Sequence, residues 1–377
     1  MAQRILTISF YLLFFLTPLV WAPMNFELFE YNKMMFVYLL TIIIGVCWVW
    51  KMAQTKSLIL NKTPLDIPLM LFLAANILST IFSVDHHTSI WGYYSRSNGG
   101  LLSTISYLIL YYALVSNFEK VRVFKFLKAA IFGGGIIAIW AILEHFGGSI
   151  SCAILTGKFN DACWVQDVKA RVFATLGQPN WLAAYLAMLI FPALYFTLTA
   201  TKKSSTILYT LYSILFYLAF TFTYSRGASL GLLAGLVVFI AMLSRHKHLF
   251  NPRGCILIIS SFLAVNLLFG SALTNFKLLS KFAPPSRPSL TTAIKASGTQ
   301  LETGGTESGK IRLIVWKGAL EIFKHYPIFG SGVETFAYSY YNFRPVEHNL
   351  VSEWDFLYNK AHNEYLNYLS TTGILGD

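Results

Sequence analysis

An arginine in a short turn between two apolar segments is the first position at which this sequence could bind an anion. Arg226 directly follows Ser225, which could cap the next helix. The free amides of a helix start, the helix dipole and a guanidinium all favour an anion at the same point. Anchoring at the membrane interface is the alternative role for Arg226.

A second arginine lies in a helix that the sequence predicts over 311–324. At 100° per residue, Lys317, Glu321 and Lys324 share one polar face, and Arg312 falls opposite, among apolar side chains. A buried guanidinium needs an anionic partner, whereas an arginine near a helix end can extend to water. We expect Arg312 to face a ligand.

His362 and Asn363 precede the last apolar segment. An interfacial histidine can act as a general base near neutral pH, although a single histidine more often has a structural role. His348 forms a similar pair with Asn349, but it is not at the entrance of a segment, so we rank it lower. His362 is therefore the predicted catalytic base.

Arg171 opens another apolar segment, and the polar residues Gln178 and Asn180 flank Pro179 just inside it. A helix start with such a kink can line a cavity in the membrane. Arg171 and Asn180 are accordingly candidates for substrate binding, with a structural role equally open.

Metal and cofactor signals are weak. Glu353 and Asp355, with Glu347 and His348 nearby, could hold a divalent ion, but a solvated loop is the commoner explanation. The sequence has no phosphate-binding glycine loop of the Walker type, no nucleophile elbow and no zinc-type Cys/His spacing. We therefore predict no metal and no cofactor.

The elements that must position these residues are membrane helices. Of the 377 residues, 55% are hydrophobic and 12% are charged, about half the charge of a soluble chain. This composition excludes a soluble enzyme, a disordered chain and a small disulfide-rich domain. Apolar segments of spanning length are predicted at 5–22, 34–50, 65–84, 100–117, 129–146, 181–200, 206–223, 227–243 and 254–273.

The distribution of Lys and Arg predicts a cytoplasmic N-terminus. In that orientation the inner loops carry 13 of these residues and the short outer loops carry six. The net charge of +12 then follows from topology and requires no nucleic-acid partner. The spans are almost free of charge, which argues against an ion-coupled transporter and for chemistry at the outer surface. Arginines with a base suit a lipid-linked phosphate or diphosphate.

The chain divides into four predicted ranges. Residues 1–150 form N-terminal spans, 151–273 central spans and 274–363 an outer loop domain with a flexible stretch at 284–310. Residues 364–377 would start a tenth span that the end of the sequence cuts. The aromatic run of Phe336, Tyr338, Tyr340 and Tyr341 could stack on sugars or pack within the outer domain. Cys152 and Cys163 share one outer loop, where a disulfide and two free thiols are equally open.

Four motifs in order over residues 170–377 resemble the O-antigen ligase and O-antigen polymerase family of bacterial membrane glycosyltransferases. The motifs are RVFATLGQPNWLAAYL, TYSRGASLG, RLIVWKGALEIFKHYPIFGSGVETF and AHNEYLNYLSTTGILGD. The resemblance implies an all-α polytopic fold of the C-type glycosyltransferases, with a long outer loop domain. Family members normally continue through further spans, so this chain is expected to be truncated at its C-terminus.

The resemblance also implies an activity. Such enzymes transfer a glycan from an undecaprenyl-diphosphate carrier to an acceptor hydroxyl on lipid A core, a cell-surface polymer or a protein. They act at the outer face of the cytoplasmic membrane, invert the sugar and need no metal. Arg226 and Arg312 match the family's diphosphate-binding arginines, His362 its essential histidine and Arg171 a basic position.

Three alternatives remain at this point. A polymerase would use a second lipid-linked repeat as the acceptor. A transporter of anionic lipid-linked solutes would show an inverted repeat, which the sequence lacks. A scaffold without activity is the third alternative.

Overall fold

The structure is a computed structural model that describes residues 1–25, 27–245, 252–273 and 308–376. Within these ranges every element of regular secondary structure is helical. The flexible stretch predicted at 284–310 lies almost wholly outside the described residues. The chain divides into two compact units, and each is described by itself. Unit 1 comprises Met1–Gln3, Val37–Asn117 and Arg287–Asp377, and unit 2 comprises Arg4–Phe36 and Phe118–Ser286.

Each of the nine predicted apolar segments coincides with a helix. Five helices of the described residues are long and apolar enough to cross a membrane: α2 (Glu30–Thr55), α6 (Lys120–His145), α8 (Pro179–Thr199), α9 (Lys203–Thr221) and α10 (Arg226–Arg245). The other four are shorter apolar helices: α1 (Ala2–Phe15), α3 (Asp66–Ile81), α5 (Leu101–Asn117) and α11 (Pro252–Phe269). The predicted class, an all-α polytopic membrane protein, is confirmed.

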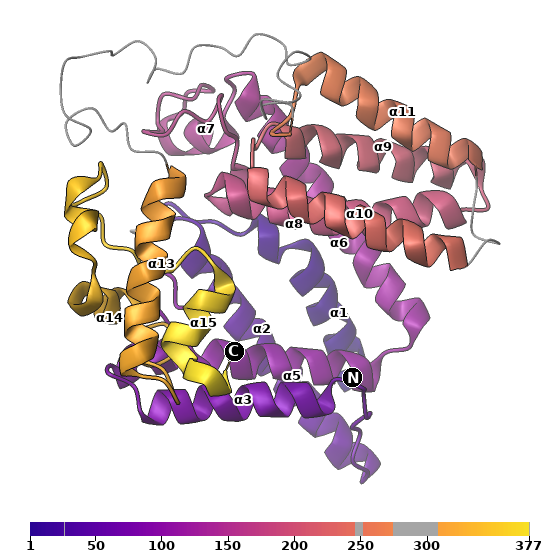
Figure 1. Cartoon of the computed structure of the whole chain (residues 1–377). Coiled ribbons are helices and arrows are strands. Elements are labelled where there is room, and N and C mark those ends of the chain that lie inside the picture. The colour runs from indigo at the N-terminus through magenta and orange to yellow at the C-terminus, as the bar shows by residue number, and fades with distance from the viewer. Residues whose placement is uncertain (26, 246–251, 274–307, 377) are drawn as a thin grey trace, which may run out of the picture. The chain divides into compact units, whose positions relative to one another are not determined.

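Unit 2 is a helical bundle in which α8 and α9 pack against α6 (Figure 1). Three consecutive glycines of α6 allow this close approach. A Cβ on Gly134 would lie 2.2 Å from Leu189 of α8, and one on Gly135 would lie 2.5 Å from Tyr212 of α9. Small residues at such contacts let helices approach where lipid supplies no hydrophobic driving force. This packing fixes the start of α8, which carries Asn180.

Unit 1 combines most of α2 with α3, α4 (His86–Trp91) and α5, and with the helices near the end of the chain. In Figure 1 the latter are α13 (Ser308–His325), α14 (Phe336–Phe343) and α15 (Glu364–Thr372). They share a core of apolar side chains made by Ile311, Val315, Ala319, Ile322, Phe336 and Tyr340.

The helix α15 begins at Glu364, where the sequence predicts the start of a span, but it ends at Thr372. Gly373 stops it with a φ of 65°, a left-handed conformation that costs glycine little. The helix packs on α13 and α3 and buries the polar residues Asn367, Ser370 and Thr371. In this structure α15 is therefore a short helix of the unit 1 core that ends at Thr372, and the start of a tenth span over 364–377 stays a prediction.

Candidate functional site

The described residues contain two clusters of predicted site residues, one in each unit. In unit 1, Arg312 and His362 lie with Arg96, and we call these three residues the arginine–histidine cluster. In unit 2, Arg171 and Asn180 lie with the turn before Arg226, and we call these three residues the α8–α10 cluster. Because Arg226 belongs to the other unit, its predicted convergence with Arg312 and His362 stays a prediction.

The helix α13 holds the loop that carries His362. The indole Nε1 of Trp316 donates a hydrogen bond of 3.0 Å to the carbonyl oxygen of Ala361, which is fully buried. Arg312 lies one turn before Trp316 on the same side of α13. The hydrogen bond from Trp316 therefore keeps the His362 loop on the face of α13 that bears Arg312.

Neighbouring side chains fix the conformation of His362. The Asn363 Oδ1 caps α15 by accepting a bond of 3.4 Å from the Leu366 amide, and the Asn367 Oδ1 accepts one of 3.3 Å from the Ala361 amide. Between these anchors His362 has a φ of 55°. Such a left-handed conformation is uncommon for residues other than glycine, and it is found often at functional sites.

The surroundings of His362 favour the neutral imidazole. Burial lowers its pKa below the ordinary value of 6.5, and the positive charges of Arg312 and Arg96 lower it further, against the opposing effects of Glu353 and Glu364. The ring of Tyr358 meets the imidazole edge to face, with centroids 5.4 Å apart. A neutral histidine in the field of two guanidinium groups can act as a base next to a bound anion.

Arg312 differs from the prediction because its side chain is exposed. The buried face of α13 is formed by Ile311, Val315, Ala319 and Ile322, and Arg312 lies beside this face, one residue after Ile311. Its charge nevertheless lowers the pKa of His362. Arg312 thus borders the His362 loop and is not embedded in the core.

Arg96 was not predicted as a site residue, because it was included only in the count of loop charges. Arg96 lies in the turn between α4 and α5, and its charge acts on His362. A signal was present: Tyr94-Ser95-Arg96 repeats the tripeptide Tyr224-Ser225-Arg226. Both turns contain a residue with a φ of 49°, Ser97 in one and Tyr224 in the other.

An ion pair joins the turn of Arg96 to the loop of His362. Lys360 Nζ donates to the Glu334 carboxylate, whose side chain is 8% exposed. A Cβ on Gly99 would lie 2.2 Å from the same carboxylate oxygen, so the turn packs directly on Glu334. Glu334 itself has a φ of 61°. Glu334 therefore contacts both segments that carry the arginine–histidine cluster.

In unit 2 a shared acceptor connects α8 to the turn before α10. The Asn180 Oδ1 accepts hydrogen bonds from Arg171 Nη2 at 3.1 Å and from Ser225 Oγ at 2.9 Å. Arg171 Nε also donates to the carbonyl oxygen of Thr223 at 3.0 Å. Arg226 follows as the first residue of α10 and is exposed. The three predicted residues Arg171, Asn180 and Arg226 thus belong to one end of unit 2.

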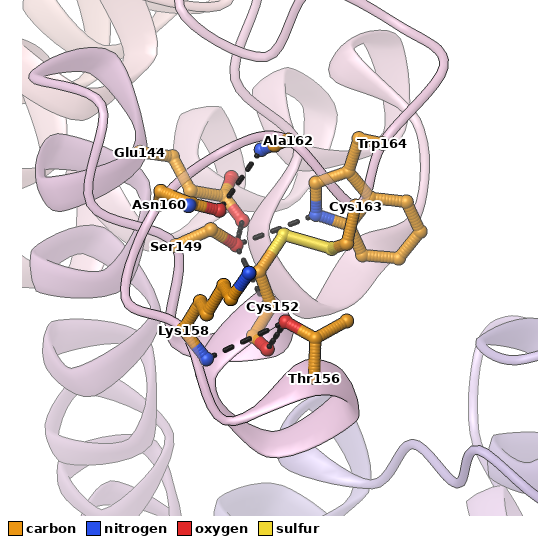
Figure 2. The surroundings of a disulfide bond; sticks show 9 residues. All are labelled: Glu144, Ser149, Cys152, Thr156, Lys158, Asn160, Ala162, Cys163 and Trp164. Carbon is orange, nitrogen blue, oxygen red and sulfur yellow. Dashed lines mark hydrogen bonds between the residues drawn. A yellow bond between two sulfur atoms is a disulfide. The ribbon is translucent and has the colours of Figure 1, made fainter.

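The loop after α6 is closed by a disulfide between Cys152 and Cys163 (Figure 2). Figure 2 also shows Ser149 between its partners: its Oγ donates to the Glu144 Oε1 at 3.4 Å and accepts from Trp164 Nε1 at 3.3 Å. The other Glu144 oxygen accepts the Ala174 amide at 2.9 Å. Buried Glu144 therefore ties the disulfide loop to the segment that follows Arg171.

Glu353 and His348, two of the residues considered for a metal site, have structural partners. The Glu353 carboxylate accepts a hydrogen bond from the Tyr358 hydroxyl. His348 is buried, and its Nδ1 lies 2.6 Å from the Tyr340 hydroxyl and its Nε2 3.2 Å from the Glu353 carbonyl oxygen. Among the residues that the structure describes, no three His, Cys, Asp or Glu side chains are grouped as metal ligands.

Comparison with known proteins gives one family. Residues 208–376 match the family model described as O-antigen ligase. The matched range contains Arg226, Arg312 and His362, and Arg171 and Asn180 lie before it. Searches of the curated proteins and of the solved structures found no match. The resemblance predicted from the motifs is thereby confirmed for residues 208–376.

Proposed function

From the membership of residues 208–376 in the O-antigen ligase family, we propose that this multi-pass membrane protein is a glycosyltransferase that uses an undecaprenyl-diphosphate-linked glycan as donor. The acceptor is a hydroxyl group of lipid A core, of a cell-surface polymer or of a protein. The observation that carries the proposal is the arginine–histidine cluster, in which a neutral histidine lies in the field of two arginines.

His362 is the general base of the proposed reaction. It takes the proton of the acceptor hydroxyl as that oxygen attacks the anomeric carbon. The bond between this carbon and the diphosphate oxygen breaks, and the diphosphate leaves with the electron pair. A single displacement inverts the anomeric centre. Since a diphosphate leaves without protonation, the reaction requires no acid.

Arg312 and Arg96 stabilise the charge that develops on the leaving diphosphate. Charge-assisted hydrogen bonds strengthen as this charge grows, so they lower the barrier more than they favour the ground state. Removing one such donor costs about 2–4 kcal/mol of transition-state stabilisation. In the proposal, guanidinium groups supply the charge that a metal ion supplies in other transferases.

In the proposal the α8–α10 cluster contributes to donor binding through its cations. Arg171 and Arg226 provide cationic groups at the starts of two helices, where free amides add to the attraction. Asn180 and Ser225 position Arg171 through the hydrogen bonds described above. The imidazole of His145 stacks on Phe222, in the turn that Arg171 bonds, with ring centroids 3.7 Å apart. The proposal assigns binding to this cluster and proton transfer to His362.

The disulfide supports an outward-facing placement of the end of unit 2 that carries the α8–α10 cluster. Disulfides persist in oxidising compartments outside the cytoplasm. Arg171, which follows the disulfide loop, bonds the α9–α10 turn at Thr223, and the Tyr224 hydroxyl in that turn is 3.5 Å from the carbonyl oxygen of Phe269. The chain therefore leaves α11 at the same end of unit 2 as the disulfide loop.

A transfer assay with the purified full chain tests the proposal. The donor is the undecaprenyl-diphosphate-linked glycan extracted from the producing cells, and the acceptor is lipid A core from the same cells. We expect Arg312→Ala and His362→Ala to lose most transfer, and Lys317→Ala, which removes an exposed cation from the same helix, to retain it. Near-wild-type transfer by either cluster variant would refute the assignment.

A further inference from the structure

Unit 1 contains a cavity of about 510 Å³ that no step of the proposed reaction uses. Its walls carry aromatic rings from three stretches of the chain: Tyr93 and Tyr94 after α4, Tyr326 after α13, and Tyr338 and Tyr341 on α14. The volume lies within the range of about 300–1,000 Å³ that is typical of small-molecule sites.

The rings of α14 divide between the core and this cavity. Phe336 and Tyr340 are buried and stack on each other with centroids 5.3 Å apart. Tyr338 and Tyr341 line the cavity, and Tyr341 is 75% exposed. The core therefore accounts for two of the four aromatic residues singled out in the sequence. The other two present large rings to solvent in a concave wall, which folding alone does not require.

Fixed polar groups accompany these rings. Asp85 and Asn342 line the same cavity, and Asp85 is oriented because its Oδ1 accepts the Thr88 amide at 3.2 Å. The Thr88 Oγ1 lies 3.3 Å from the Asp85 Oδ2 and 3.2 Å from the Tyr338 hydroxyl, so one threonine hydroxyl links the carboxylate to the phenol. Burial and the neighbouring Tyr94 raise the pKa of Tyr93, so its hydroxyl stays neutral.

This combination of groups matches a sugar. A pyranose ring has apolar C–H faces that pack on aromatic rings, and its edge carries hydroxyl groups that bond to carboxylate, amide and phenol groups. A cavity for an acyl chain would not need Asp85 and Asn342. Tyrosines that only anchor a protein in the membrane interface need no concave wall.

Two segments that line the cavity lead along the chain to residues at the arginine–histidine cluster. The amides of Arg96 and Ser97 both donate to the carbonyl oxygen of Tyr93 at 2.9 Å, so the turn of Arg96 begins at a cavity residue. Leu357, which lines the cavity, precedes Tyr358, whose ring meets His362. A ligand in the cavity would thus touch the segments that position the proposed base.

We infer that this tyrosine-lined cavity of unit 1 is a carbohydrate subsite that holds a sugar residue of one of the two glycan substrates. The inference rests on the proposed function for the identity of those substrates. The chemistry of the cavity fits a sugar of the donor or of the acceptor equally well, so the experiment must separate these sources.

Direct binding is the first test. The probe is the oligosaccharide released by mild acid hydrolysis from the cell-envelope polysaccharide of the producing cells, titrated into the detergent-solubilised full chain and followed by saturation-transfer NMR. Tyr341→Ala and Asn342→Ala should each raise the Kd about tenfold or more. Tyr365→Ala is the matched control, because this tyrosine is 78% exposed in the same unit and does not line the cavity; its Kd should stay unchanged.

Absence of binding to the wild-type chain would overturn the inference, and so would equal Kd values for wild type and Tyr341→Ala. A Tyr341→Ala variant with unchanged saccharide binding but weaker partition into vesicles would indicate a membrane anchor and would also overturn it. Because Tyr341 and Asn342 are exposed, both variants should fold, and unchanged thermal unfolding checks this.

Kinetics with the two substrates is the second test. A rise in KM of Tyr341→Ala for the acceptor alone assigns the cavity to the acceptor, and a rise for the donor alone assigns it to the donor. Unchanged KM values for both substrates would contradict the inference. The two proposals can fail separately. Full transfer by His362→Ala would refute the proposed mechanism. Even then, loss of saccharide binding by Tyr341→Ala would still support the subsite.

Discussion

The same tripeptide, Tyr-Ser-Arg, occurs in two turns of this protein, and the side chains around it differ between the two turns. In unit 2 it precedes α10, and Ser225 bonds to Asn180, which also holds Arg171. In unit 1 it places Arg96 where its charge acts on His362. In the first turn the serine is bonded to an amide that also holds an arginine, and in the second turn the arginine acts on an imidazole. The comparison shows that the same tripeptide meets different partners, which the fold brings from elsewhere in the chain.

Loss of the base should give the largest effect. We expect His362→Gln to lower kcat for glycan transfer by about 10²–10⁴-fold, the usual contribution of general base catalysis. Donor binding should change little, because the arginines remain. Transfer assays and a separate measurement of donor binding check this, with His87→Gln, an exposed histidine of α4, as the control. A kcat within a few fold of wild type would remove the distinction between the two clusters.

Removal of a cation from the α8–α10 cluster should act on donor binding. Arg171→Ala and Arg226→Ala should raise the KM for the lipid-linked donor by about 10–100-fold, since a charge-assisted hydrogen bond contributes about 1.5–3 kcal/mol. The pH dependence of kcat should stay that of wild type. If these variants instead shifted the pH profile, unit 2 would also carry a proton-transfer role.

We expect Glu334 to affect activity only by positioning the loop that carries His362. The Glu334→Gln variant removes the negative charge that pairs with Lys360, whose side chain is 30% exposed. The remaining hydrogen bond to the amide oxygen is weaker, at a cost of about 1 kcal/mol. We expect kcat/KM to fall about tenfold and thermal stability to fall with it. Lys360→Met and the double variant complete a cycle, in which strongly non-additive losses show that the pair works as a unit. Additive losses would separate Glu334 from the His362 loop.

Loss of the disulfide should give the smallest effect on activity. Cys152→Ser with Cys163→Ser removes a cross-link that typically contributes about 2–4 kcal/mol of stability. We expect a lower Tm and a rise of a few fold in the KM for the donor, because the loop leads to Arg171. The pH profile governed by His362 should not move. A changed profile would mean that the disulfide loop supports the base as well.

The sequence predicted the helices well and their contacts poorly. Apolar runs long enough to span a membrane force helix formation, because backbone groups in lipid must be satisfied within the segment. The split of the aromatic run of α14 follows helical spacing, because Phe336 and Tyr340 share one face and Tyr338 and Tyr341 share another. The spacing does not say which face meets the core.

Site residues show the same limit. The proximity of Arg96 to His362 depends on contacts between parts of the chain more than 260 residues apart in sequence, and no local pattern encodes them. The exposure of Arg312 was mispredicted because the helix begins at Ser308 and its buried stripe runs through Ile311 and Val315, next to the arginine. A helical wheel places side chains around an axis but does not say which side meets the core.

The pH dependence of kcat/KM tests the central claim most directly, because it reports the ionisation of the base in the free enzyme. Burial and Arg312 lower the pKa of His362 below 6.5, so activity should rise with pH, with the midpoint of the rise below pH 6.5. In Arg312→Gln, loss of the positive charge should move this rise to higher pH. An unchanged pH profile in Arg312→Gln, or a wild-type rise with its midpoint above pH 6.5, would contradict the account.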